Sequence, residues 1–234
     1  MVIISRNFRA FRVRKLVFIS PVSDFPNPYK LQFQGSRAAL WLLRALGWRV
    51  EFDGFPTSQG IAVVYPHTSN WDAPLMFLVK WATGVQVMFW GKDTLFKIPL
   101  LGSWLRWMGG VPVERTSKHG VVGAMMAQMA QKKALDEYFW LGLAPEGTRK
   151  YIPGWRSGFY RVALSCDVPL LVVTLDYSRR ECKVNQFIKL TGDAVIDMAR
   201  VAAVCAPARG LKPANMSPVV LLDAAMDRQH TVVK

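Results

Sequence analysis

Hydrophobic and polar positions follow two different periods along the chain after residue 60. Short apolar runs rich in β-branched residues predict strands over residues 61–65, 85–90, 111–113, 139–144 and 170–175. Helical spacing predicts helices over residues 71–81, 99–108, 120–138 and 158–165. Strands that alternate with helices are typical of α/β proteins. The sequence therefore predicts an α/β fold with a mostly parallel central sheet flanked by helices.

The first fifty residues have a different pattern. Residues 1–36 mix arginines, aromatics and prolines, and a helix is predicted over residues 36–48. Its apolar side chains lie mainly on one side, with arginines beside them. Such a helix fits a membrane interface or the protein's own core, and periodicity alone leaves both open. We predict a basic, amphipathic, membrane-associating segment (residues 1–50), a domain (residues 51–205) and a C-terminal tail (residues 206–234).

Composition and charge narrow the class of partner. The 234 residues are 51% hydrophobic and 20% charged, which excludes a wholly disordered chain. The net charge of +14 indicates an anionic partner, either nucleic acid, an acidic membrane surface or a phosphorylated substrate. Residues 1–50 hold nine basic residues and one acid, so much of this charge forms a patch. The three cysteines are too few and too far apart for a disulfide framework or a zinc site.

A histidine and a carboxylate follow the first predicted strand at its C-terminal end, where open α/β sheets commonly place their sites. His67 begins the run His-Thr-Ser-Asn-Trp-Asp, which ends at Asp72. Within one helix the two would lie about 140° apart, so they meet only if the chain turns before a helix starts. Pro74 favours that start, with Ser69 or Asn70 as the N-cap. The pair is either a general base with its orienting carboxylate or a structural hydrogen bond.

Two further motifs place polar groups after predicted strands. Residues 144–149, Ala-Pro-Glu-Gly-Thr-Arg, combine a glycine with a hydroxyl and a guanidinium, which are parts of an oxyanion or phosphate cradle. Many such runs are only turns. Residues 109–115 place Arg115 at the end of a short strand, and the planar fork of arginine suits a phosphate monoester. The sequence has no G-x-S-x-G elbow, P-loop, G-x-G-x-x-G or metal-spaced histidine pair, which disfavours serine hydrolases, kinases and zinc enzymes.

Taken in order, these motifs resemble the glycerolipid acyltransferases, the family of the bacterial lysophosphatidate (1-acylglycerol-3-phosphate) acyltransferases. His67-x4-Asp72 is similar to the first block of that family. The second, third and fourth blocks are similar to residues 110–115, 145–149 and 168–173. Residues 92–99 and 155–163 resemble the segments that follow the first and third blocks. The resemblance is greatest to a short bacterial subgroup that has His-Thr-Ser-Asn-Trp-Asp and lacks long membrane helices.

The resemblance implies an acyltransferase that needs no cofactor and no metal. His67 would remove the proton from an acceptor hydroxyl while Asp72 holds its ring, and the oxygen would attack the thioester of acyl-CoA or acyl-carrier protein. Substrate-binding roles are implied for Arg115, Glu146, Gly147, Thr148 and Arg149. The expected acceptor is a lysolipid, 1-acylglycerol-3-phosphate, which would give phosphatidate. Lyso-ornithine lipid, another lysophospholipid and glycerol-3-phosphate are the alternative acceptors.

The basic N-terminus predicts where the protein works. Near anionic lipid each lysine or arginine contributes about 1 kcal/mol of binding, so we expect a peripheral, monotopic protein on the cytoplasmic face of the inner (plasma) membrane. The alternatives from another class are a non-catalytic lipid-binding protein and a nucleic-acid-binding protein. The sequence carries no nucleic-acid-binding motif and its charge is concentrated outside the predicted domain, so we expect no nucleic-acid partner.

Overall fold

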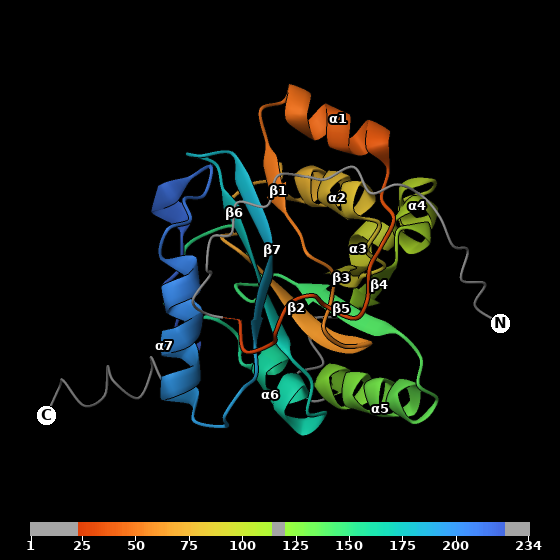
Figure 1. The fold of residues 1–234 in the computed structure, drawn as a ribbon, viewed down its shortest axis with the longest axis vertical. Coiled ribbons are helices and arrows are strands. Elements are labelled where there is room, and N and C mark those ends of the chain that lie inside the picture. The colour runs from red at the N-terminus through yellow and green to blue at the C-terminus, as the bar shows by residue number, and fades with distance from the viewer. Residues whose placement is uncertain (1–22, 114–119, 223–234) are drawn as a thin grey trace, which may run out of the picture.

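The computed structural model describes residues 23–113 and 120–222, which form a seven-stranded sheet with helices around it (Figure 1). The strand order is β1-β7-β6-β2-β5-β3-β4. The strands are β1 (Arg49–Glu51), β2 (Gln59–Tyr65), β3 (Met88–Lys92), β4 (Gly110–Val113), β5 (Phe139–Leu143), β6 (Leu170–Asp176) and β7 (Glu181–Ile188). Strands β2 to β6 are parallel, whereas β7 is antiparallel to β6 and β1 is parallel to β7. The predicted α/β fold with a mostly parallel sheet is confirmed.

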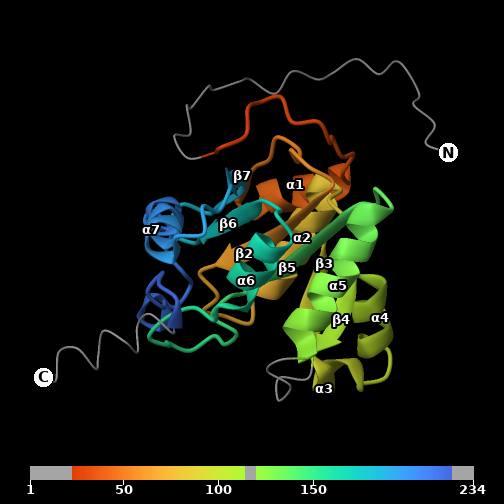
Figure 2. The same ribbon diagram turned by 90° about the horizontal axis from the view of Figure 1, so that it is seen from below.

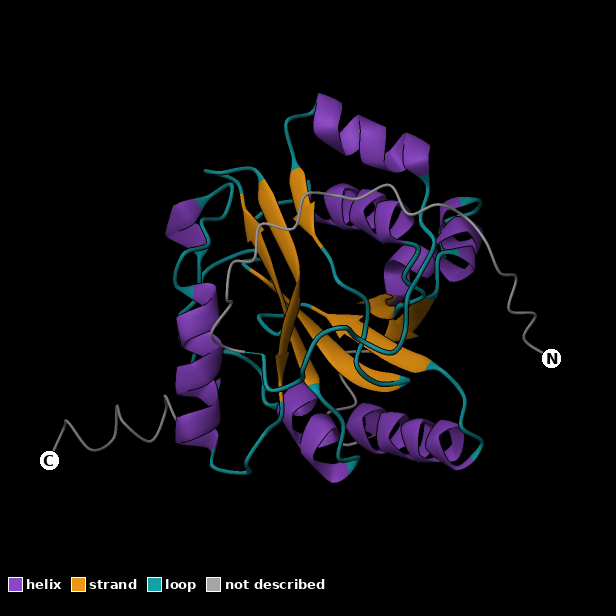
Figure 3. Ribbon diagram, in the orientation of Figure 1, coloured by secondary structure: helices purple, strands orange, loops and turns teal. Residues whose placement is uncertain are grey.

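Helices cover the sheet on both sides (Figures 2 and 3). They are α1 (Arg37–Ala45), α2 (Asp72–Thr83), α3 (Asp93–Phe96), α4 (Leu101–Trp107), α5 (Gly120–Ala134), α6 (Gly158–Ser165), α7 (Ala194–Cys205) and the short 3-10 helix η1 (Pro213–Asn215). Helices α3 and α4 connect β3 to β4, and α5 connects β4 to β5. Within the described ranges, no helix combines the length and the apolar character needed to cross a bilayer.

Two hydrophobic cores lie on opposite faces of the sheet. On one face Ile61 and Val63 of β2 pack with side chains of α5, α6 and α7. On the other face the intervening Ala62 packs with side chains of α1 and α2 and with a group of buried aromatic rings. Because neighbouring residues of a strand point to opposite faces, one short apolar strand supplies both cores. Strand β2, which precedes the candidate site, is thereby held from both sides.

The second core depends on a glycine opposite a tryptophan. Gly60 of β2 pairs in register with Trp140 of β5. A Cβ atom at Gly60 would lie only 2.2 Å from the Trp140 ring, so no other residue fits there without displacing the ring. The Trp140 ring in turn packs against Phe55 at a centroid distance of 4.4 Å.

Both ends of the described chain pack on the central domain. Leu43 of α1 is fully buried and Trp48 is nearly so, and β1 forms an edge of the sheet. At the other end, Leu221 forms a parallel bridge with Trp155. The division of the chain at residues 50 and 205 stays a prediction. Membrane association of residues 1–50 stays a prediction.

Candidate active site

The candidate active site lies where β6, β2 and β5 end side by side. His67 comes shortly after β2, Glu146 shortly after β5, and Tyr177 directly after β6. Strand β2 is parallel to both neighbours, so the three segments leave the sheet at the same edge. This is the edge at which open α/β sheets commonly bind ligands. The fold therefore brings together two predicted site residues, His67 and Glu146, that are far apart in sequence.

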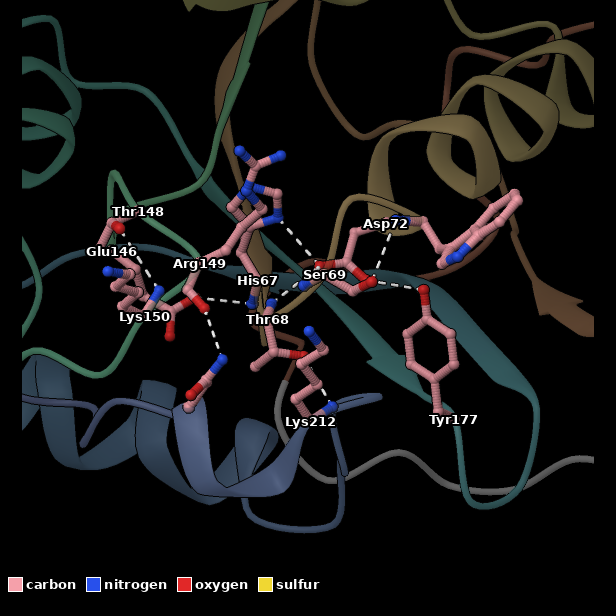
Figure 4. Close-up of polar contacts among 12 residues, drawn as sticks. His67, Thr68, Ser69, Asp72, Glu146, Thr148, Arg149, Lys150, Tyr177 and Lys212 are labelled. Carbon is pink, nitrogen blue, oxygen red and sulfur yellow. Dashed lines mark hydrogen bonds and ion pairs between the residues drawn. The ribbon is translucent and has the colours of Figure 1, made fainter.

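The segment after β2 turns so that His67 meets Asp72. Nδ1 of His67 lies 3.1 Å from Oδ2 of Asp72, as Figure 4 shows. The same oxygen accepts the backbone N–H groups of Thr68 at 2.8 Å and of Ser69 at 2.9 Å. One carboxylate oxygen thus fixes both the turn and the imidazole ring. The structure contains the contact between His67 and Asp72 that the sequence predicted, while its catalytic role stays a prediction.

The start of α2 differs from the predicted one. Its N-cap is Trp71, which makes no capping bond with its side chain, whereas Ser69 or Asn70 was expected at that position. The hydroxyl of Ser69 instead accepts the backbone N–H of Trp71 at 3.2 Å. Asp72 is the first helical residue and supplies the acceptor for the turn. A carboxylate in the first turn is also favoured by the helix dipole.

Asp72 is buried, and both of its carboxylate oxygens accept hydrogen bonds. Tyr177 donates its hydroxyl to Oδ1 at 2.7 Å. Burial raises the pKa of Asp72, but the hydrogen bonds from His67 and Tyr177 outweigh this effect, so the pKa lies below its ordinary value. An ionised Asp72 is an acceptor for a proton on Nδ1 of His67, and this arrangement leaves Nε2 free to face a substrate. Burial and the bond to Asp72 raise the pKa of Tyr177, which therefore stays a donor.

Glu146 has no exposed surface and supports the backbone of the histidine. Its Oε2 accepts the backbone N–H of His67 at 2.7 Å, and its Oε1 accepts the backbone N–H of Ser217 at 3.2 Å. Burial raises the pKa of Glu146, although the bonds from His67 and Ser217 act in the opposite direction. The sequence predicted that Glu146 contacts the substrate. In the structure the buried carboxylate holds the backbone of His67, and its contact with substrate stays a prediction.

The predicted turn after β5 closes at Gly147. Its backbone N–H donates to the carbonyl of Ala144 at 3.0 Å, and its φ of +64° lies in the left-handed region. A Cβ atom at this position would lie 2.9 Å from Nε of Arg156. Both the backbone conformation and the close approach therefore favour glycine here. Its predicted contact with substrate stays a prediction.

Thr148 and Arg149 continue this turn toward the surface. Oγ1 of Thr148 accepts the backbone N–H of Lys150 at 3.4 Å, and the backbone carbonyl of Arg149 accepts Nδ2 of Asn215 at 3.0 Å. The side chain of Arg149 is exposed and extends in the same direction as the His67 ring in Figure 4. Substrate contacts of Thr148 and Arg149 stay predictions. Arg115, also predicted to bind substrate, lies outside the described residues.

A C-terminal strap, defined as residues 206–222, completes the site. The backbone N–H of Lys212 donates to Oγ1 of Thr68 at 3.3 Å, next to His67. Gly210 permits this approach, because a Cβ atom there would lie 2.6 Å from the same hydroxyl. Ser217 of the strap binds Glu146, as described above. The strap therefore holds the segment after β2 and the segment after β5 at the same time.

Sequence reasoning missed Tyr177 and Ser217. Tyr177 directly follows β6, so the rule about strand ends that singled out His67 would also have found it. Ser217 follows no strand and belongs to no motif, so the fold alone places it. Across residues 23–113 and 120–222, no group of three or more His, Cys, Asp or Glu side chains is placed to hold a metal ion.

Together, the fold and this site define an α/β protein in which a buried carboxylate holds a partly exposed histidine. A family model described as Acyltransferase matches residues 49–176, which is more than half of the chain. The chain belongs to this acyltransferase family, which confirms the resemblance stated from its motifs. The match runs from β1 to the end of β6 and includes the segments of His67, Asp72 and Glu146.

Two individual proteins are similar to this chain. The chloroplastic 1-acyl-sn-glycerol-3-phosphate acyltransferase LPAT1 of Arabidopsis thaliana is 27% identical over 158 residues. The aligned region is 64% of this chain but only 42% of the Arabidopsis protein. The crystal structure of the 1-acyl-sn-glycerophosphate (LPA) acyltransferase PlsC from Thermotoga maritima matches with a TM-score of 0.49 and 19% sequence identity, covering 74% of this chain and 78% of that one.

Proposed function

We propose that this protein is an O-acyltransferase that moves a fatty acyl group from a thioester to the hydroxyl of a lysolipid. We propose 1-acylglycerol-3-phosphate as the acceptor and phosphatidate as the product. The observation that carries the proposal is the hydrogen bond from a partly exposed His67 to the buried carboxylate of Asp72. Membership of the acyltransferase family supports the reaction class, and the activity named for the Arabidopsis relative supports the acceptor.

His67 acts as the general base in this reaction. Its Nε2 takes the proton of the acceptor hydroxyl while the oxygen attacks the carbonyl carbon of the thioester. The C–S bond then breaks, and the thiolate takes the proton back from the imidazolium and leaves as a thiol. Asp72 holds Nδ1–H and stabilises the imidazolium that forms in between. The donor is acyl-CoA or acyl-carrier protein, which present the same thioester.

The remaining groups of the site position the base and the acceptor. Glu146 fixes the backbone of His67, and Tyr177 fixes the second oxygen of Asp72. Arg149 supplies an exposed guanidinium next to the site for the phosphate of the acceptor. We place the protein at the cytoplasmic face of the inner membrane, where the basic residues of the N-terminal segment meet anionic lipid.

A panel of acceptors tests this proposal. The full chain is incubated with palmitoyl-CoA and, in turn, lysophosphatidate, lyso-ornithine lipid, a lysophosphatidylglycerol and glycerol-3-phosphate, and both thiol release and the acylated product are measured. We expect the highest kcat/KM with lysophosphatidate. Arg149→Gln should raise the KM for lysophosphatidate, whereas Arg161→Gln, which removes an exposed arginine of α6, should not.

The outcomes separate the parts of the proposal. Turnover with another acceptor alone would overturn the assignment of lysophosphatidate and keep the reaction class. If no hydroxyl acceptor is acylated, with either palmitoyl-CoA or palmitoyl-acyl-carrier protein as donor, the proposed function is wrong.

A further inference from the structure

One short segment leaves many large apolar side chains in solvent. The α3–α4 surface is defined as Leu95, Ile98, Leu100, Leu101, Trp104 and Trp107, all of which are at least 36% exposed. Leu100 is 87% exposed and Trp107 is 74% exposed. Apolar side chains scattered singly on a surface are normal, but a concentration of this kind marks an interaction site.

Leu100 is exposed in an unfavourable backbone conformation. Its φ of 63° and ψ of −53° lie outside the allowed left-handed region, which needs a positive ψ, and the N–H of Leu101 donates to the carbonyl of Pro99 at 2.7 Å. The three residues form a γ-turn of the rare, strained kind. The turn directs a leucine away from the protein core at a cost in backbone energy. A partner that takes up the side chain would explain why a leucine stands there.

The α3–α4 surface begins at the same edge of the sheet as the candidate active site. Strand β3 is parallel to β5, and β5 is parallel to β2, so β3 ends at the edge where His67 is found. Helix α3 begins at the residue after β3, and the turn at Leu100 follows it. Trp71, which is 68% exposed, lies at this edge as well, beside Asp72. Helix α4 then leads back to the start of β4, so the part of the α3–α4 surface at this edge is α3 with the turn at Leu100.

Basic side chains accompany these apolar ones. Residues 92–108 contain two lysines and one arginine but only one acid, Asp93. The side chain of Lys97 is 76% exposed, and it pairs with Asp93 at 3.0 Å. The guanidinium of Arg106 lies 5.6 Å from the centre of the Phe96 ring. Tryptophan and leucine flanked by lysine and arginine are typical of surfaces that lie in the headgroup region of anionic membranes.

We propose that the α3–α4 surface inserts into an anionic lipid bilayer, with Leu100 at its tip. The side chains of Leu100 and Trp107 enter the boundary between headgroups and acyl chains, and the basic residues meet lipid phosphates. This inference deepens the proposed function and rests on it for the identity of the acceptor. It assigns a second membrane contact, separate from residues 1–50, and directs the opening of the site toward the lipid.

Vesicle flotation of the full chain without substrates tests this assignment. The vesicles contain phosphatidylcholine alone or phosphatidylcholine with phosphatidylglycerol. The variants are Leu100→Asn, which keeps a residue that tolerates positive φ, and its combination with Trp107→Gln. The control is Val195→Gln with Ile196→Gln, which removes two exposed apolar side chains from α7, on the opposite side of the molecule (Figures 1 and 2).

We expect the wild type to bind the vesicles that contain phosphatidylglycerol more strongly. The partition coefficient of Leu100→Asn should be about tenfold lower than that of the wild type, and that of the double variant about a hundredfold lower. Each substitution removes one large apolar side chain from the lipid. The α7 control should stay within about twofold of the wild type. The melting temperature of Leu100→Asn should stay near the wild-type value, because the exposed side chain of Leu100 contributes little packing.

Three outcomes decide the proposal. Unchanged partitioning of a folded double variant would overturn it. A loss of binding in Trp41→Gln of α1, with none in Leu100→Asn, would assign the contact to α1 and also overturn it. Vesicle binding that depends on Leu100 would support it even if the acceptor panel failed, so the failure of the proposed function is distinguishable from the failure of this inference.

Discussion

The buried carboxylate of Glu146 offers a sharp test of how the site is held. Glu146→Gln keeps the shape of the side chain and one carbonyl oxygen, which can still accept the backbone N–H of His67. The amide NH2 then faces the backbone N–H of Ser217, so that a donor meets a donor where the wild type has a bond of 3.2 Å. The substituted side chain is uncharged and keeps its bond to His67, but it loses the bond to Ser217 of the strap.

The size of the effect follows from one buried N–H left without an acceptor. Such a group costs about 1–3 kcal/mol, part of which is offset because glutamine buries no charge. In a domain of this size each kcal/mol corresponds to about 2–4 °C, so the melting temperature should fall by about 2–12 °C. If the backbone of His67 shifts as a result, kcat should fall about 10- to 100-fold, with the KM for the acceptor unchanged.

Steady-state kinetics and thermal unfolding of the same preparation measure both effects. Tyr65→Phe is the matched control, because it removes the hydroxyl that donates to the carbonyl of Ser217 at 2.9 Å but keeps the bonds between Ser217 and Glu146. We expect it to cost about 1 kcal/mol of stability and to leave kcat near the wild-type value. If Glu146→Gln raises the KM for the acceptor and leaves kcat unchanged, Glu146 contacts substrate and the positioning role is refuted.

Three further changes test other parts of the site. The pKa of Asp72 is lowered in the folded state, so ionised Asp72 stabilises the fold above its ordinary pKa of about 4. This stabilisation is lost as the pH falls through the lower pKa of the folded state. Urea titrations at a series of acidic pH values should therefore show a steeper loss of stability in the wild type than in Asp72→Asn. Tyr177→Phe removes one hydrogen bond to a charged group and should lower kcat by about tenfold at most, with KM unchanged; an unaltered kcat would exclude a role for the hydroxyl. Gly147→Ala forces a Cβ into a left-handed turn and against Arg156, and should lower the free energy of unfolding by about 1–2 kcal/mol; equal stability would show that the turn accommodates it.

The parallel part of the fold could be predicted because its strands are continuous apolar runs. Strand β6 is buried along its whole length, and the helix predicted over residues 158–165 coincides with α6. Strand β7 was missed although its first residues alternate between partly exposed ones, such as Lys183 and Asn185, and buried ones, which is a pattern typical of strands. Helix α7 was missed although Asp193 caps it by accepting two backbone N–H groups, which is a signal that the sequence carries.

The candidate site was predictable only where function depends on residues close in sequence. His67 and Asp72 are five positions apart, and turn geometry alone allowed them to meet. The bond from Glu146 to Ser217 joins two loops that no local pattern connects. The burial of Glu146 could not be read from the motif either, so its bond to the backbone of His67 was not predicted.

The most direct test of the central claim is thiol release from palmitoyl-CoA in the presence of lysophosphatidate, measured for the wild type and for His67→Ala. The account predicts turnover by the wild type and a loss of about 10²–10⁴-fold in the variant, with the circular dichroism spectrum retained. Equal turnover by the two proteins would contradict the assignment of His67 as the base.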